Sequence, residues 1–238
     1  HILHLIGPHP DPSEFGNTQS QTAGRHRLGV PGKHVHVGDD AGLFEKCCCI
    51  PASARVALAV ASKDLVAGGV VALLGEHVEA HRDVVDDLHT GGHELAVHGW
   101  THRAVVTRSQ SELTSELLRT GDLLCDVTGA WPRWYRPPFG LTNRACLYAA
   151  SSAGLQPVLW TAWGRDWSRH ITPTGIEWRV RRTLRPGGTV LLHDTDRYAA
   201  IGSWRRTVVA LDRLLTQWHA AGLTVGPLAE HGLPSGTG

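Results

Sequence analysis

Two patterns of hydrophobic and polar positions alternate along this chain. Short continuous apolar runs are typical of parallel strands covered on both faces, and apolar residues at every third or fourth position are typical of helices. The alternation predicts an α/β fold with a parallel sheet and right-handed connections. The runs expected to form strands are Ile2–Ile6, His34–Val37, Val70–Leu74, Glu94–Val97, Val158–Trp163, Thr189–Leu192 and Leu223–Val225.

Helical periodicity fills much of the sequence between these runs. The best-marked start is at Ser109, because Ser109 and Glu112 have the spacing of a capping box. Gly91-Gly92 and Ala221-Gly222 are suited to end helices. Helices are therefore expected over residues 55–67, about 77–89, 109–125 and 142–153, and through Val208, Leu211, Leu215 and Trp218.

Length and composition limit the classes of protein to which this chain can belong. A chain of 238 residues with 42% hydrophobic residues fits one α/β domain, which we expect over residues 34–228. Residues 1–33 are expected to form a strand and a loop, and residues 229–238 a disordered tail. A net charge of +1 gives no electrostatic footprint for nucleic acid, and no apolar run approaches the roughly 20 residues that span a bilayer. The chain begins at His1 without any Met, which is compatible with a removed signal peptide.

Candidate metal ligands gather at two predicted strand ends. His98 and His102 follow the strand Glu94–Val97, and neutral imidazole is the commonest protein ligand for zinc. Asp39 and Asp40 follow the strand His34–Val37, although Gly-Asp-Asp-Ala-Gly also has the composition of a solvated turn. With 16 His in the chain, a pair at this spacing is also expected by chance.

Two further stretches carry residue types that suit catalysis. Arg136 precedes a rigid diproline, where a permanently charged guanidinium can hold a carboxylate, or can be an ordinary surface arginine. His193 ends the strand Thr189–Leu192, where it is either a proton donor or a buried histidine bonded to backbone.

Together, His98–His102, Trp134–Gly140 and Thr189–Asp194 resemble the motifs of the NodB-homology polysaccharide deacetylases, carbohydrate esterase family four, over roughly residues 68–228. The resemblance implies a distorted, incomplete (β/α) barrel and hydrolysis of the N-acetyl group of an N-acetylglucosamine unit, with release of acetate. The substrate would be a polysaccharide or a glycoconjugate such as a glycosylated antibiotic. A secreted or envelope-associated protein is implied, and a cytoplasmic one remains compatible with the sequence.

The resemblance also implies a role for each matching residue. A divalent ion, zinc or in its place cobalt or nickel, would be held by Asp40, His98 and His102. Asp39 would be the base, oriented by Arg136, and His193 the acid, tuned by Asp166. The backbone N–H of Phe139 would bind the oxyanion, and Trp167 and Leu191 would enclose the acetyl methyl group or simply belong to the core.

The first motif departs from the family pattern Thr-Phe-Asp-Asp-Gly-Pro. Only the Asp pair remains at Asp39-Asp40, with Gly38 before it and Ala41-Gly42 after it. The segment from Gly7 to Pro12 echoes the continuation of that motif but lacks the pair. The departure keeps a second hypothesis open, a catalytically inactive carbohydrate-binding module on the same fold.

The cysteines do not indicate a disulfide scaffold. Cys47, Cys48 and Cys49 are consecutive and match no zinc-ribbon spacing, and the total of five leaves at least one thiol unpaired. We interpret them as structural or incidental.

Substitutions are expected to distinguish the roles of Asp39 and Asp40, because a base and a metal ligand need different geometry. Asp39→Asn should keep the metal and lose most turnover, whereas Asp40→Asn should weaken metal binding itself. Metal content and acetate release of the two variants check this. If both variants stay loaded and active, the Asp pair is a surface turn.

Overall fold

The structure, a computed structural model, describes residues 2–6 and 68–231, which belong to one compact unit. In this part of the chain, eight strands form one sheet, in the order β5-β4-β3-β2-β1-β7-β6, with β8 paired to β1. With the helices between them, they confirm the predicted α/β class. The strands are β1 Ile2–Ile6, β2 Val70–Leu73, β3 Glu94–Val97, β4 Trp134–Tyr135, β5 Gln156–Pro157, β6 Ala162–Trp163, β7 Thr189–Leu191 and β8 Thr224–Gly226.

The sheet curls toward a barrel. Its two edge strands, β5 and β6, are consecutive in the chain and separated by only four residues, which can span at most about 18 Å. Alternate residues of the strands point inward and form one small cluster with residues of the connecting segments. This inner cluster contains Val70, Ala96, Trp134, Val158, Leu191 and Leu228. The inner cluster fills the space that the curled sheet encloses, as in a small incomplete barrel.

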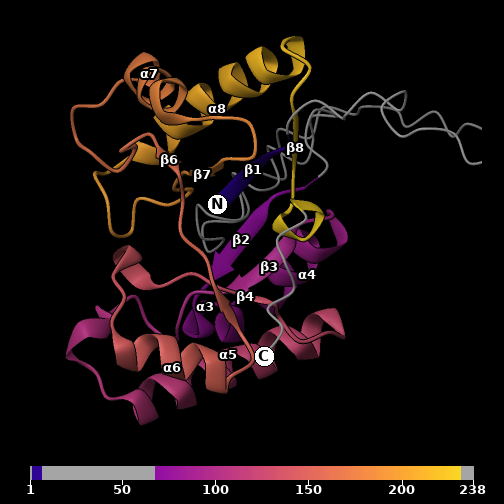
Figure 1. The fold of residues 1–238 in the computed structure, drawn as a ribbon, viewed down its shortest axis with the longest axis vertical. Coiled ribbons are helices and arrows are strands. Elements are labelled where there is room, and N and C mark those ends of the chain that lie inside the picture. Colours follow the sequence, from indigo (N-terminus) through magenta and orange to yellow (C-terminus); the bar gives the residue numbers. More distant parts are fainter. Residues whose placement is uncertain (1, 7–67, 232–238) are drawn as a thin grey trace, which may run out of the picture. The chain divides into compact units, whose positions relative to one another are not determined.

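The helices cover the outside of the sheet in two groups. Helices α5 and α6 pack together and bury one cluster with the outward residues of β2, β3 and β4, such as Val71, Val97 and Tyr135. Helices α7 and α8 pack together against β6 and β7 (Figure 1). The helices are α3 Gly75–Ala80, α4 Arg82–Thr90, η2 Val105–Thr107, α5 Gln110–Thr128, η3 Pro138–Gly140, α6 Arg144–Ser152, α7 Pro173–Thr183, α8 Ser203–Ala220 and η4 Leu228–His231.

The sheet differs from the prediction of a wholly parallel one. β2, β3, β4 and β5 run parallel, as do β6 and β7, but β1 is antiparallel to β2, β7 and β8. Consequently Ile2 pairs with Leu191 near the carboxyl end of β7, whereas Ile6 pairs with Thr224. An apolar run of five residues predicts a strand but not its direction, because direction depends on partners far away in the sequence.

Several element boundaries also differ. The single helix expected over residues 77–89 is broken at His81, whose φ of −141° and ψ of 54° lie outside the helical region. The strand expected over Val158–Trp163 is present only at its end, as β6. Helix α7 was not predicted, because only Ile176 and Val180 of its residues are buried.

The ends of the expected domains lie partly outside the described residues. Helix η4 extends to His231, two residues past the start of the tail predicted at residue 229. The strand His34–Val37, the helix over residues 55–67 and the boundary at residue 33 lie outside the described part. Among the described helices, none is both long and apolar enough to cross a lipid bilayer.

The capping box predicted at Ser109 is present, and it gives a test of helix α5. The Ser109 hydroxyl accepts from the Glu112 backbone N–H, while the Glu112 carboxylate accepts from the Ser109 backbone N–H. Ser109→Ala should lower the free energy of unfolding by about 1 kcal/mol in urea titrations, because an N–H of the first turn loses its partner. Ser115→Ala, on the exposed face of the same helix, is the control and should change it by less than about 0.5 kcal/mol. Equal losses in the two variants would contradict the capping role.

Candidate active site

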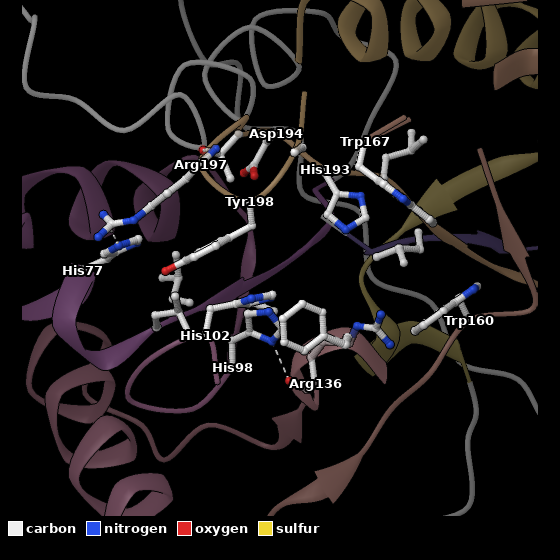
Figure 2. A pocket seen from close by; sticks show the side chains of 18 of the residues that line it. His77, His98, His102, Arg136, Trp160, Trp167, His193, Asp194, Arg197 and Tyr198 are labelled. Atoms are coloured by element: carbon white, nitrogen blue, oxygen red, sulfur yellow. Dashed lines mark hydrogen bonds between the residues drawn. The ribbon is translucent and has the colours of Figure 1, made fainter. Parts of the chain in front are cut away.

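The carboxyl ends of the parallel strands open into one pocket of about 560 Å³ (Figure 2). Its walls come from the residues that follow β2, β3, β4, β6 and β7, which is where barrel enzymes carry their chemistry. Seven of the residues singled out from the sequence line this pocket. They are His98, His102, Arg136, Phe139, Trp167, Leu191 and His193.

His98 is held in one tautomer by the neighbouring strand. Its Nδ1 lies 2.6 Å from the carbonyl oxygen of Arg136, and because a carbonyl only accepts, Nδ1–H donates and leaves the Nε2 lone pair free. Its own backbone N–H donates to Leu73 at the end of β2. Burial, followed by the proximity of His102, lowers the pKa of His98 to about 3. The imidazole is therefore neutral at physiological pH, as a metal ligand must be.

His102 lies beside His98 on the loop that leads to η2. The two ring centroids are 5.0 Å apart. Tyr198 stacks on the His102 ring at 4.4 Å with an interplanar angle of 17°, and the Phe139 ring meets it edge-on at 4.4 Å. Burial lowers the pKa of His102 to about 4, and its Nδ1 is buried with no hydrogen-bond partner in the described part of the chain. His102 is thus a second neutral imidazole with unused bonding capacity.

Arg136 is an unusual buried cation. Its side chain is part of a residue that is only 4% exposed, and its guanidinium carbon lies 3.7 Å from the centre of the Trp160 ring. Burial lowers its pKa to about 9, and among the described residues its Nη1 has no hydrogen-bond partner. A buried guanidinium with an unmet donor is well suited to receive a carboxylate.

His193 is oriented by a buried carboxylate. Its Nδ1 lies 3.0 Å from Oδ1 of Asp166, and its backbone N–H donates to Oδ2 of the same residue at 2.5 Å. Thr207 on α8 donates its hydroxyl to Oδ2 at 3.0 Å. Asp166 is fully buried and receives all three donors, so Nδ1 of His193 is committed and Nε2 is left for the pocket.

The pocket also contains residues that the sequence did not single out. Trp160 and Trp163 line one side of it. On the other side, Arg197 donates to Nε2 of His77 at 2.8 Å, and Tyr198 covers His102. Arg197 and Tyr198 come from a loop without periodicity. The high number of tryptophans, nine in 238 residues, is the sequence signal that could have drawn attention to Trp160 and Trp163.

The other site residues that the sequence predicted do not line the pocket, or lie outside the described residues. Asp166 does not line the pocket but supports His193 from behind. Asp39 and Asp40, together with the alternative Asp11, lie outside the described residues. The cysteines take no part: Cys125 and Cys146 are free thiols away from the pocket, and the other three lie outside the described part.

The two histidines fit a divalent transition metal. Both are neutral, and His98 presents Nε2 while its Nδ1–H donates to a backbone carbonyl, which is the usual way in which a metal-binding histidine is oriented. Within residues 2–6 and 68–231, however, no group of three or more His, Cys, Asp or Glu is placed to hold a metal. A third protein ligand would therefore have to come from elsewhere in the chain.

The chain is similar to known proteins in both sequence and structure. Residues 56–158 match the polysaccharide deacetylase family. A chitooligosaccharide deacetylase of Rhizobium leguminosarum bv. trifolii is 28% identical over 164 residues, which are 66% of this chain and 76% of the relative. A carbohydrate esterase family 4 pseudoenzyme from Bacillus anthracis aligns in structure with a TM-score of 0.65 and 26% identity, over 75% of this chain and 59% of that one.

These findings confirm the resemblance to the NodB-homology polysaccharide deacetylases, carbohydrate esterase family four. The uncharacterized protein YlxY of Bacillus subtilis (strain 168) is 25% identical over 158 residues. The match covers 66% of this chain but only 46% of YlxY. The proteins that this chain resembles thus include both a deacetylase and a pseudoenzyme.

The lowered pKa of His98 predicts how acid affects the metal-free protein. In the unfolded chain a histidine takes up a proton near pH 6.5, whereas folded His98 stays neutral down to about pH 3. Between these values the unfolded state binds more protons, so the free energy of unfolding falls as the pH is lowered through this range. At pH 5, in the presence of a chelator, unfolding should take up about one proton through His98.

Urea titrations between pH 7 and pH 4 measure this uptake as the slope of unfolding free energy against pH. His98→Gln should lower the slope at pH 5 by about one proton relative to the parent. Identical slopes for the parent and His98→Gln would show that His98 is not held neutral.

Proposed function

We propose that this protein is a metal-dependent N-deacetylase that hydrolyses the N-acetyl group of an N-acetylglucosamine unit and releases acetate. The observation that carries the proposal is the convergence of His98, His102, Arg136 and the Asp166-supported His193 in one pocket. Three strand ends that are distant in sequence bring together neutral imidazoles, a buried cation and a histidine with a free Nε2.

A divalent ion, zinc or in its place cobalt or nickel, would be held by His98, His102 and Asp40. When bound, such an ion supplies Lewis acidity toward the amide carbonyl. His98 contributes through Nε2, since its Nδ1 is committed to the Arg136 carbonyl.

Two proton transfers are assigned to the protein. Asp39 would remove a proton from the attacking water, and Arg136, whose guanidinium is buried, would orient it. His193 donates a proton from Nε2 to the nitrogen of the leaving amine, while Asp166 holds Nδ1 and so keeps the ring directed at the pocket.

The acetyl group itself is bound by three residues. The backbone N–H of Phe139 stabilises the developing oxyanion, a role that depends on backbone position and not on the side chain. Its φ of 58° belongs to the left-handed region, which turns the chain sharply after Pro138. Trp167 and Leu191 line the pocket beside His193 and form an apolar place for the methyl group.

The substrate that the comparisons favour is a glycan polymer or oligomer, because a chitooligosaccharide deacetylase is among the relatives. The tryptophans of the pocket wall supply aromatic faces that suit sugar rings. A small glycoconjugate, such as an N-acetylglucosaminyl antibiotic, would use the same acetamide site.

A second function is favoured by one observation. A structural relative is a pseudoenzyme. The protein would then bind an N-acetylated glycan in the same pocket without turning it over.

One experiment separates the two functions. The purified protein is loaded with zinc, and metal content and acetate release from acetylated chito-oligomers are measured. An enzyme should hold about one equivalent of zinc and release acetate. His193→Ala should keep the zinc and lower turnover by about 10²–10⁴-fold, because it removes only the proton donor.

His102→Ala is the companion variant and should lose both metal and activity, because it removes a ligand. Glycan binding without acetate release, at any metal loading, would favour the inactive module. Turnover by His193→Ala within a few-fold of the parent would remove His193 from the mechanism.

A further inference from the structure

Three tryptophans, Trp160, Trp163 and Trp167, form a row in the pocket between Arg136 and His193. The ring centroids of Trp160 and Trp163 are 5.6 Å apart, and those of Trp163 and Trp167 are 5.0 Å apart. The row begins under the guanidinium of Arg136 and ends at His193, whose ring meets Trp167 edge-on at 5.2 Å (Figure 2). Trp160 is thus the aromatic residue in direct contact with Arg136.

The Arg136 guanidinium packs on the face of the Trp160 ring. The guanidinium is buried, and in the described part of the chain no partner holds its Nη1. A planar, weakly hydrated guanidinium is attracted to the face of an indole ring, and this attraction is stronger away from water. Trp160 lies in the connection between β5 and β6, so it reaches Arg136, which follows β4, from a different part of the chain.

The same ring packs against the turn that contains Phe139. A Cβ added to Gly140 would lie 2.3 Å from Cη2 of Trp160 and 2.6 Å from Cζ3. Phe139 and Gly140 both have positive φ, 58° and 67°. The indole therefore lies against a left-handed stretch of backbone that only a glycine at position 140 leaves open.

We propose that Trp160 is a positioning residue, which holds the Arg136 guanidinium and the Phe139–Gly140 backbone where the deacetylation needs them. The inference rests on the proposed function, in which Arg136 orients the base and the Phe139 N–H binds the oxyanion. Trp160 acts through these two neighbours.

The direct test is the NMR signal of the Arg136 side chain, assigned by its loss in Arg136→Lys. A guanidinium 3.7 Å above an indole is shifted upfield by the ring current. Trp160→Phe keeps an aromatic face and should keep most of the shift, whereas Trp160→Leu should abolish it. An unchanged Arg136 signal in Trp160→Leu overturns the proposal, and this readout needs neither metal nor activity.

Kinetics supply the second readout. Trp160→Leu should lower kcat by about 10–10²-fold with KM changed by less than about three-fold, because small misplacements of a catalytic group are costly. In an Arg136→Lys background the same substitution should cost less than about three-fold more, since residues that act through one another are not additive. Fully multiplicative effects overturn the proposal.

A matched pair of glycine substitutions avoids any change at Trp160 itself. Gly140→Ala and Gly129→Ala place a side chain at almost the same positive φ, 67° and 72°, but only the first collides with Trp160. Gly140→Ala should therefore reproduce the loss of the Arg136 shift, and Gly129→Ala should not. If both or neither move the signal, the contact does not position Arg136.

The two proposals fail separately. If the zinc-loaded parent releases no acetate, the proposed function fails, while the NMR comparison of Gly140→Ala with Gly129→Ala, in which the Trp160 ring is kept, still decides whether Trp160 places Arg136. If Trp160→Leu does not fold, Trp160→Phe and Gly140→Ala decide the question.

Discussion

The hydrogen bond between the His98 imidazole and the Arg136 carbonyl ties the site to the sheet. The Arg136 backbone N–H donates to the carbonyl of Val97, and the His98 backbone N–H donates to the carbonyl of Leu73. These two bonds link the end of β4 to β3 and the end of β3 to β2. Parallel strands one hydrogen bond apart bring their last residues within reach of each other. The tautomer of a histidine and the position of a buried arginine therefore follow from one backbone register.

Burial then sets the chemistry of this edge of the sheet. The same desolvation that keeps His98 and His102 neutral also leaves the Arg136 cation short of solvent. The two effects are complementary, because neutral imidazoles suit a cation and an isolated guanidinium suits an anion. A pocket built in this way has bonding capacity for a metal and for a carboxylate side by side, whether or not the protein turns its ligand over.

The sequence predicted those features whose signal lies within a few neighbouring residues. The histidine pair, the capping box at Ser109 and the residues around Arg136 and His193 each carry their signal within a few neighbours, and the structure brings the histidines and the arginine to one pocket. The direction of β1 and the break at His81 depend on partners far along the chain. The contacts of Trp160 and Tyr198 depend on loops whose paths no periodicity describes. The roles of Asp39 and Asp40 stay predictions.

The hydroxyl of Thr207 makes an outer helix part of the pocket. Thr207 belongs to α8, whose inner face packs among residues such as Leu211 and Leu214, yet its hydroxyl reaches the carboxylate that orients His193. A shift of α8 along its own axis by a fraction of a turn, about 1–2 Å, would withdraw that donor. The inner face of α8 must therefore fill the core and also keep the Thr207 hydroxyl within hydrogen-bond distance of Asp166. Mutational tolerance on this helix should follow distance from Thr207 more closely than it follows burial.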